Sequence, residues 1–407
     1  MSDSLDISTV FKDEYSNLVA VLCHYYNLND IQSAEDIVSD TFVKAMKTWS
    51  HKGIPDSPKA WLRKTAVNIL IDQQRRKKTF EEKVAPNLTS ENSSINQLEI
   101  TDKIIEDSQL RMMFHVCDPT LKNKAQLCLS LRILCGFSIE EIAKALLSNK
   151  ESINKNLYRA KKAIRAKDDF ESNLPKATYL ARLDTVLRVL YLIFNEGYHS
   201  SVNEETIRHE ICWEAMHLCK FLAQQSFFPK SKIQALLALM CFHASRLHAR
   251  ASENNISQLY HDQDKTKWNA SLIQKGEQYL SQSATGNIVS KYHIEAAIAY
   301  WHTTDKESKW DNILQLYNHL LTIEYSPIIA MNRTYALAMA NSIEEAIEEA
   351  LKLELKGNHF YFCLLAELFR LNSETKKEIF YLNKALEFVR KQNEKALILL
   401  KLKKAKQ

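Results

Sequence analysis

Apolar side chains recur at helical spacing along most of this chain. In SAEDIVSDTFVKAMKTW, which starts at residue 33, they mark one face of a helix: Ile37, Val38, Thr41, Phe42, Ala45 and Trp49. Ser33 and Asp36 have the spacing of a capping box at the start of that helix. A second helix follows in PKAWLRKTAVNILIDQQRRKK, where Ser57 can cap and Pro58 can take the first helical position. Residues 1–80 therefore predict one small helical module.

Residues 81–108 lack such a pattern. They are polar, contain Pro86 and a cluster of Ser and Asn, and carry more acidic than basic side chains. This composition is typical of a linker between two modules.

Beyond the linker the pattern predicts a helix-turn-helix. An apolar helix closed by Gly136 is followed by two short helices, the first with a capping box formed by Ser138 and Glu141. A second capping box, Ser148 with Glu151, opens the next helix. Two short helices joined by a tight turn are the signature of this motif.

In the second of these helices, the face opposite the apolar stripe carries cations and hydrogen-bond donors: Lys150, Ser152, Asn154, Lys155, Asn156, Tyr158, Arg159 and Lys162. Side chains of these types read base edges and phosphates in a major groove. The alternative is a helical hairpin with a solvated basic face. The capping boxes, the turn length and the charge together favour DNA binding for this module, which we expect to span residues 109–169.

From residue 170 to 407 the chain reads as successive amphipathic helices. NSIEEAI at 341 and NSETKKEI at 372 occupy comparable positions in two helix pairs. Their spacing, about 31 residues, is near the 34-residue period of tetratricopeptide repeats, whose concave surfaces suit peptides or another domain. Two interpretations stay open. One is a regulatory module packed against the first two modules, and the other is an effector-binding or enzymatic domain with polar pocket residues such as Glu196, His199, Asp262, Asp264 and Arg333.

Composition favours an all-α fold. Six Gly and seven Pro leave few sites for tight hairpins, and no two glycines lie close enough for a Gly-rich phosphate loop or a nucleophile elbow. The eight cysteines form no Cys-x-x-Cys pair, so we expect reduced core residues. The sequence holds no metal-ligand spacing and no base-plus-nucleophile arrangement, so we expect no metal, no cofactor and no enzymatic activity. It also lacks a leader or a membrane-length apolar run, which predicts a cytoplasmic protein.

The net charge of +5 is small, but basic residues gather at 63–78 and at 150–167. One charge run is usually a solvated face. Two of them on separate amphipathic segments favour a polyanionic partner.

These two modules, joined by an acidic linker, resemble the extracytoplasmic-function group of bacterial sigma-70 factors. AEDIVSDTFVKAMKTW and AWLRKTAVNILIDQQRR look like conserved regions 2.2 and 2.3 to 2.4, and FSIEEIAKALLSNKESINKNLYRAKKAIR looks like region 4.2. YLIFNEGY, QDKTKWN, YHIEAAIAYWH and SPIIAMNRTYALAMA resemble the C-terminal extension of a subgroup, often described as tetratricopeptide-like. The resemblance implies an all-α chain with two sigma modules, a flexible linker and a helical repeat-like domain.

The resemblance also implies roles for individual residues. The helix that docks on the β′ clamp helices of core RNA polymerase would present Glu35, Asp36, Asp40 and Phe42. Contacts to the promoter −10 element would come from Lys59, Arg63, Lys64, Asn68, Arg75 and Arg76, with the loop from His51 to Asp56 placed where the family captures a flipped base. The helix 148–165 would read the −35 element, and the β flap of the polymerase is a further partner. The implied partners are core polymerase, promoter DNA and a regulatory protein or ligand at the C-terminal domain, without a membrane.

The stretch FNEGYHSS, at 194–201, interrupts an apolar run. Gly197 suits a left-handed cap that ends the preceding helix. An acid in the last turn is unfavourable to the helix dipole, which suggests a second role for Glu196. We interpret Asn195, Glu196 and Tyr198 as a joint between the promoter-reading half and the part that controls it, with helix termination and internal packing favoured over ligand binding.

A second function class stays open for the whole molecule. An effector-responsive repressor or activator with a helix-turn-helix would bind DNA without core polymerase, usually as a dimer on palindromic sites. A sigma factor would bind promoter DNA only together with core polymerase.

Overall fold

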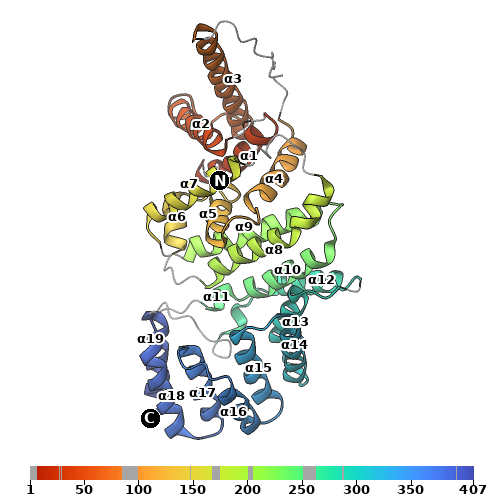
Figure 1. Ribbon diagram of the computed structural model, residues 1–407, viewed down its shortest axis with the longest axis vertical. Coiled ribbons are helices and arrows are strands. Elements are labelled where there is room, and N and C mark those ends of the chain that lie inside the picture. Colours follow the sequence, from red (N-terminus) through yellow and green to blue (C-terminus); the bar gives the residue numbers. More distant parts are fainter. Residues whose placement is uncertain are drawn as a thin grey trace. The chain divides into compact units, whose positions relative to one another are not determined.

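The computed structural model describes residues 7–26, 28, 30–84, 100–146, 148–166, 175–199, 205–250, 263–286, 288–390 and 392–407. Every regular element in these ranges is a helix, which confirms the all-α prediction (Figure 1). None of the described helices has the length and apolar character needed to cross a membrane. The chain forms two compact units, the first with residues up to 202 and 206–214, the second with residues 203–205 and 215–407.

The first unit holds the two modules predicted to bind DNA. Its helices are α1 (Ile7–His24), α2 (Ile31–Lys52), α3 (Pro58–Val84), α4 (Asp102–Val116), α5 (Asn123–Ile133), α6 (Ile139–Ala145), α7 (Lys150–Arg165), α8 (Lys176–His199) and the first half of α9 (Glu205–Gln224). They are coloured red to light green in Figure 1.

Helix α1 lies at the centre of the first bundle, where it packs against α2, α3 and α4. Its second half is apolar on more than one face, and Leu18, Val19, Leu22 and Cys23 are buried. A helix that is apolar around its circumference has to be covered from several sides. This requirement brings α4, which follows the predicted linker, onto the first module.

The irregular linker predicted for residues 81–108 is helical at both ends. α3 continues to Val84, and α4 begins at Asp102, where the Thr101 hydroxyl accepts a hydrogen bond from the backbone N–H of Ile104 at 3.4 Å. Residues 85–99 lie outside the described ranges. The polar sequence hid the start of α4 because this helix is stabilised by burial of residues such as Ile105 against other helices.

Helix α8, the first helix of the extension, packs against α4 and α5. The Tyr179 ring meets the Phe114 ring edge-on, with 4.8 Å between centroids. Arg182 pairs with Asp118 at 3.6 Å, between Nη1 and Oδ2. The start of the extension is therefore part of the same folded unit as the helix-turn-helix.

The helix ends within FNEGYHSS as predicted, but it ends at His199 and Gly197 is not its cap. α8 runs through Gly197 to His199, and Gly197 is buried within it. The reason is packing: Phe194 and Tyr198 stack at 5.9 Å between ring centroids, and the Cys212 thiol of α9 donates to the carbonyl of Phe194 at 3.6 Å. Asn195 and Glu196 are half-buried, while the joint that they were expected to form stays a prediction.

The second unit is a succession of helix pairs. After the rest of α9 come α10 (Lys230–Ala244), α11 (Leu247–Arg250), the short 3-10 helix η2 (Lys265–Lys267), α12 (Ala270–Ser283), α13 (Lys291–Thr303), α14 (Lys309–Ile323), α15 (Pro327–Ala340), α16 (Ile343–Lys352), α17 (His359–Leu371), α18 (Thr375–Phe388) and α19 (Gln392–Ala405). Neighbouring helices pack along the chain, α13 on α14, α14 on α15 and so on to α19. This order is expected of a helical repeat array.

Gly276 explains how α10 and α12 approach so closely. A Cβ atom at this position would lie 2.7 Å from the buried Phe242 ring, so only glycine leaves room for it. All eight cysteines are free thiols in the structure, seven of them buried and Cys363 partly exposed, as predicted.

Candidate nucleic-acid and polymerase interface

The helix-turn-helix consists of α6 and α7. Ser138 and Glu141 form the predicted capping box, with the Ser138 backbone N–H donating to Glu141 at 2.7 Å. The second predicted capping box is displaced by one residue: the N-cap of α7 is Asn149, whose side chain accepts from the backbone N–H of Ser152 at 2.7 Å. An Asn side chain caps as well as Ser, so the helix begins one residue later than predicted.

One face of α7 packs inward and the other is open to solvent. Ile153, Leu157, Ala160 and Ile164 are buried. All eight residues predicted to read DNA lie outside this stripe: Lys150, Asn154, Lys155, Tyr158, Arg159 and Lys162 are exposed, and Ser152 and Asn156 are partly exposed. Tyr158 is 68% exposed, which is unusual for a tyrosine that serves packing alone.

The ion pairs on this face are weak ones. Lys150 pairs with Glu140 at 2.8 Å, and Lys155 with Glu151 at 2.6 Å, in each case between side chains that are more than half exposed. Ion pairs between solvent-exposed side chains contribute little to stability. A phosphate can therefore replace either carboxylate at little cost.

Helix α3 carries the residues predicted for the −10 element. Lys59, Lys64, Asn68, Arg75 and Arg76 are exposed along it. The predicted loop from His51 to Asp56 is shorter than expected, because α2 continues to Lys52 and ends at Gly53, whose φ of 82° suits glycine.

Arg63 differs from the other five. Its guanidinium donates to both carboxylate oxygens of Glu14, at 3.1 and 3.2 Å, and to Asp102 at 3.4 Å. The Glu14 side chain is fully buried, and that of Arg63 is 20% exposed. Burial opposes the charge of Arg63, but the hydrogen bonds and charge of Glu14 raise its pKa above the ordinary value. In this conformation Arg63 joins α3 to α1 and α4.

The outer face of α2 carries two of the four residues predicted to contact polymerase. Asp36 and Asp40 are exposed, and one and two turns further on Val43 and Met46 are 47% and 57% exposed. Val43 and Met46 were not among the predicted residues. The sequence does mark them, because they are apolar residues that lie outside the core-facing stripe of an amphipathic helix.

The other two residues face inward. The Phe42 ring stacks on that of Phe11 in α1, with 4.5 Å between centroids. Glu35 is buried, and its carboxylate pairs with Lys161 of α7 and with Arg132 of α5, the latter at 2.7 Å. It also accepts a hydrogen bond from the Tyr15 hydroxyl. Glu35 is therefore not available to a partner in this conformation, whereas Phe42 stays partly exposed.

The electrostatics of Glu35 follow from these partners. Burial alone would raise the pKa of its carboxyl, but the charges of Lys161 and Arg132 lower it below the ordinary value. Burial and the charge of Glu35 raise the pKa of Tyr15 well above its usual range, so the phenol stays protonated and donates. The cluster is thus a buried carboxylate held by two cations and one hydroxyl.

Two family matches cover parts of the chain. Residues 11–80, which include α2 and most of α3, match Sigma-70 region 2, and residues 182–284 match a family of unknown function, DUF6596. The uncharacterized protein R00370 of Rhizobium meliloti (strain 1021) is 29% identical over 382 residues, 91% of this chain and 89% of the relative. No solved structure matches the chain.

Two named relatives match over about a third of the chain. The ECF RNA polymerase sigma factor SigX of Bacillus subtilis (strain 168) is 22% identical over 35% of this chain and 73% of its own length. The ECF RNA polymerase sigma factor BldN of Streptomyces coelicolor (strain ATCC BAA-471 / A3(2) / M145) is 30% identical over 36% of this chain and 55% of its own. The chain belongs to the extracytoplasmic-function sigma-70 family. This sigma factor carries a helical C-terminal extension.

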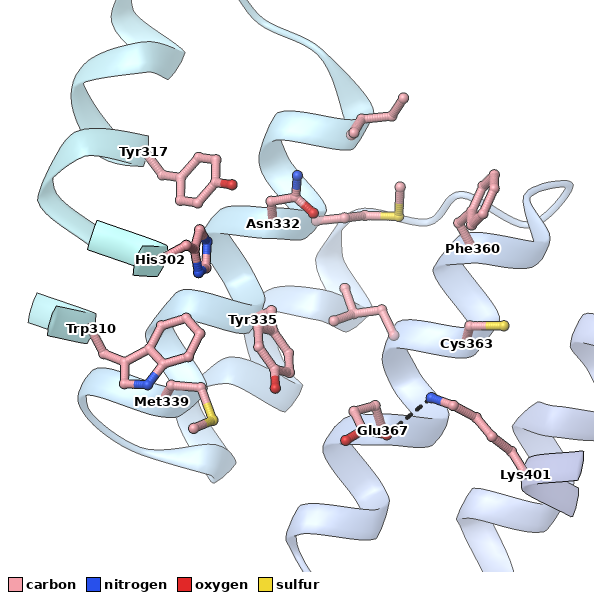
Figure 2. A pocket seen from close by; sticks show the side chains of 13 residues that line it. His302, Trp310, Tyr317, Asn332, Tyr335, Met339, Phe360, Cys363, Glu367 and Lys401 are labelled. Carbon is pink, nitrogen blue, oxygen red and sulfur yellow. Dashed lines mark hydrogen bonds and ion pairs between the residues drawn. The ribbon is translucent and has the colours of Figure 1, made fainter. Parts of the chain in front are cut away.

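The extension of this sigma factor contains a pocket of about 630 Å³ in the second unit (Figure 2). Trp310 and Tyr335 form part of its wall, in edge-to-face contact at 5.7 Å between centroids. Glu367 and Lys401 approach across it at 3.3 Å, from α17 and α19. Its other lining residues are His302, Tyr317, Ile328, Met331, Asn332, Met339, Phe360, Cys363 and Leu364.

Of the polar residues suggested for an effector pocket, the three with described side chains, Glu196, Asp264 and Arg333, do not line this cavity. Arg333 follows the pocket residue Asn332 on α15, and its guanidinium donates to the side-chain oxygen of Asn318 at 2.7 Å. Asp264 caps η2, Glu196 belongs to the first unit, and Asp262 and the side chain of His199 lie outside the described residues. The described part of the chain contains no group of His, Cys, Asp and Glu side chains suited to a metal ion.

Proposed function

We propose that this sigma factor directs core RNA polymerase to promoters by reading a −35 element with α7 and a −10 element with α3. The observation that carries the proposal is the exposed, donor-rich face of α7, in a chain whose residues 11–80 match Sigma-70 region 2. A solvent-facing row of cations, amides and a tyrosine on the second helix of a helix-turn-helix has the geometry for insertion into a major groove.

For the −35 element, the proposed readers are the residues on the open face of α7. Asn154 and Arg159 have the side chains that form bidentate pairs with adenine and guanine, respectively. Lys155 and Lys162 supply charge for the flanking phosphates. Each good base contact contributes about 1–3 kcal/mol of discrimination, and the phosphate contacts make binding salt-dependent.

For the −10 element, Lys64, Asn68 and Arg75 share one face of α3, because their spacings of four and seven residues correspond to whole helical turns. The loop between α2 and α3 presents Ile54, which is 46% exposed, at the start of this helix. An apolar side chain there can support a base that has left the stack. The loop has no aromatic residue for stacking, so we assign it no base identity.

The proposed polymerase surface is the outer face of α2. Asp36 and Asp40 supply negative charge for basic partner residues, and Val43 and Met46 supply apolar area for the centre of the contact. The proposed β′ clamp contact thus uses two of the four originally predicted residues plus two that the structure adds. The extension is proposed to modulate activity, since α8 packs directly on α4 and α5 beside the helix-turn-helix.

The test is a gel-shift titration of the full chain on promoter DNA with and without core polymerase. A sigma factor gives a promoter-specific complex only when core polymerase is present. Tight binding without polymerase would instead support the repressor or activator class. Lys155→Ala and Arg159→Ala are the matched variants, and unchanged initiation in both would refute the assignment of α7.

A further inference from the structure

The pocket in the second unit, of about 630 Å³, has the size of a small-molecule site. Side chains from five helices, α13, α14, α15, α17 and α19, form its walls. In Figure 2 the residues of α13 and α14 lie on one side of α15, and those of α17 and α19 lie on the other. Closely packed helices leave few voids larger than a water molecule. A hollow of this volume is therefore a candidate binding site.

Most of the pocket wall is apolar. The rings of Trp310 and Tyr335 stand edge to face within it. Three further apolar lining residues are open to solvent, with exposed fractions of 59% for Ile328, 38% for Met339 and 51% for Phe360. Apolar side chains that line a hollow and stay exposed favour a ligand that removes them from water. The wall therefore selects a ligand whose body is apolar.

Two of the lining residues, Glu367 and Lys401, are charged at neutral pH. Burial keeps the other titratable lining groups neutral. It lowers the pKa of His302 to about 3, and it raises the pKa values of the two lining tyrosines and of the Cys363 thiol above their ordinary values. A charged group on a ligand would therefore be recognised by Glu367 or by Lys401.

Glu367 is held more firmly than Lys401. Arg370, one turn further along α17, donates two hydrogen bonds to Oε1 of Glu367, at 2.6 Å from Nη2 and 3.2 Å from Nε. Lys401 donates to Oε2 at 3.3 Å. Burial opposes the charge of Glu367, but Arg370 and Lys401 lower the pKa of its carboxyl below the ordinary value. Glu367 thus keeps a partner when Lys401 turns away, whereas a cationic ligand would compete with both Arg370 and Lys401.

The Lys401 ammonium can bind a further anion. An ammonium group donates up to three hydrogen bonds, and one of those of Lys401 goes to Glu367. The Lys401 side chain is 26% exposed, so its attraction to an anion is screened less by water than that of a fully exposed lysine. A single negative charge on the ligand matches this one cation. A doubly charged group would leave one charge unbalanced beside the carboxylate of Glu367.

We propose that this pocket binds a small apolar monocarboxylate. The apolar body lies against Trp310, Tyr335 and the exposed apolar side chains of the wall, and the carboxylate accepts a hydrogen bond from Lys401. Arg370 then balances Glu367, and Lys401 balances the ligand. The inference goes beyond promoter recognition, because the site lies within the second unit and its occupancy is measured without polymerase or DNA.

Three probes with one naphthyl body and different charges test the proposal: naphthylacetate, naphthylacetamide and naphthylethylamine. In calorimetric titrations of the full-length protein, naphthylacetate should bind about tenfold more tightly than naphthylacetamide, because its carboxylate adds a charge-assisted hydrogen bond. Lys401→Met should remove this difference and leave the affinity for naphthylacetamide unchanged. Lys403→Met, at an exposed position on the same helix, is the matched control and should keep the difference. Thermal unfolding confirms that both variants are folded.

Cys363 gives a second readout in the wild-type protein. It lines the pocket and is partly exposed, whereas the other seven cysteines are buried, so alkylation by iodoacetamide followed by mass spectrometry reports on this site. Naphthylacetate at ten times its Kd should slow alkylation of Cys363 about tenfold, because about nine tenths of the sites are then occupied.

Four results would overturn the proposal. The first is the absence of binding by both naphthylacetate and decanoate at about 1 mM, the weak end of specific affinities. The second is tighter binding of naphthylethylamine than of naphthylacetate, which would indicate a cation site at Glu367. The third is unchanged alkylation of Cys363 when naphthylacetate is bound, which would place the ligand elsewhere. The fourth is a preference for naphthylacetate over naphthylacetamide that persists in Lys401→Met.

Discussion

Arg63 and Lys64 are neighbours on α3, and the structure gives them different surroundings. Arg63 binds both carboxylate oxygens of the fully buried Glu14, whereas Lys64 is exposed. Arg63→Ala would leave the buried Glu14 carboxylate without its guanidinium partner, although the Asn17 amide still donates to it at 3.2 Å. Loss of one member of a buried ion pair costs about 3–5 kcal/mol, and the 20% exposure of Arg63 places this case near 3 kcal/mol.

The assay is thermal unfolding of the full-length protein. For a unit of this size, about 3 kcal/mol corresponds to a fall in Tm of roughly 6–12 °C for the first transition. Lys64→Ala should change stability by less than about 0.5 kcal/mol but weaken promoter binding in the presence of core polymerase. The double variant Glu14→Gln with Arg63→Gln should recover part of the lost stability, because no charge is left buried without its partner. A Tm of Arg63→Ala equal to that of the wild type, together with weaker promoter binding, would show that Arg63 contacts DNA.

Three further predictions concern other surfaces of the molecule. Arg159→Ala should weaken polymerase-dependent promoter binding by about 1–3 kcal/mol and relax specificity at one −35 position, as measured by competition with mutated promoters; uniform weakening on all sequences would indicate a phosphate contact. Met46→Asp places a charge in the proposed apolar centre on α2 and should lower affinity for core polymerase at least tenfold, as measured by fluorescence anisotropy. Its Tm should be unchanged, and Lys47→Asp, at the exposed neighbouring position, is the control. Gly276→Ala should destabilise the second unit by about 1–3 kcal/mol, because its Cβ overlaps the Phe242 ring, and leave the first unfolding transition in place; an unchanged second transition would contradict the close packing of α10 and α12.

Local sequence signals predicted the helices well where the decisive interactions are local. The capping box of Ser138 and Glu141 and the open face of α7 could be predicted, because both depend on residues within four positions of each other. The start of α2 was predicted too late: Ser33 was expected to be the N-cap, whereas the N-cap is Asp30. Asp30 caps it by accepting from the backbone N–H of Gln32 at 3.4 Å, and it also binds the Ser33 hydroxyl that was expected to be the cap.

Long-range interactions decide what the sequence pattern could not show. Glu35 and Arg63 look like surface charges on amphipathic helices, but each meets an oppositely charged partner that is distant in the sequence. Gly197 has the residue type of a helix terminator, yet packing of its neighbours Phe194 and Tyr198 carries the helix past it to His199. The spacing of three to four residues between apolar positions predicts which face of a helix is buried. It does not predict which distant residue will pair with a buried charge.

The contacts of α8 have a consequence for experiments that separate the sigma modules from the extension. Cutting the chain after residue 169 would remove Tyr179 from the buried Phe114, Arg182 from Asp118, and Arg188 from Asn123, to which it donates at 2.6 Å. We therefore expect a 1–169 fragment to unfold at a lower temperature than the first transition of the full chain, and to expose apolar area on α4 and α5 that promotes aggregation. A fragment ending at residue 224, after α9, keeps these contacts and the Lys12–Glu210 pair, and it is the proper comparison. If the 1–169 fragment matched the 1–224 fragment in Tm and solubility, α8 would be an attachment to the sigma modules and not part of their fold. If the 1–169 fragment is destabilised as expected, its loss of activity reports on folding and not on positive regulation by the extension.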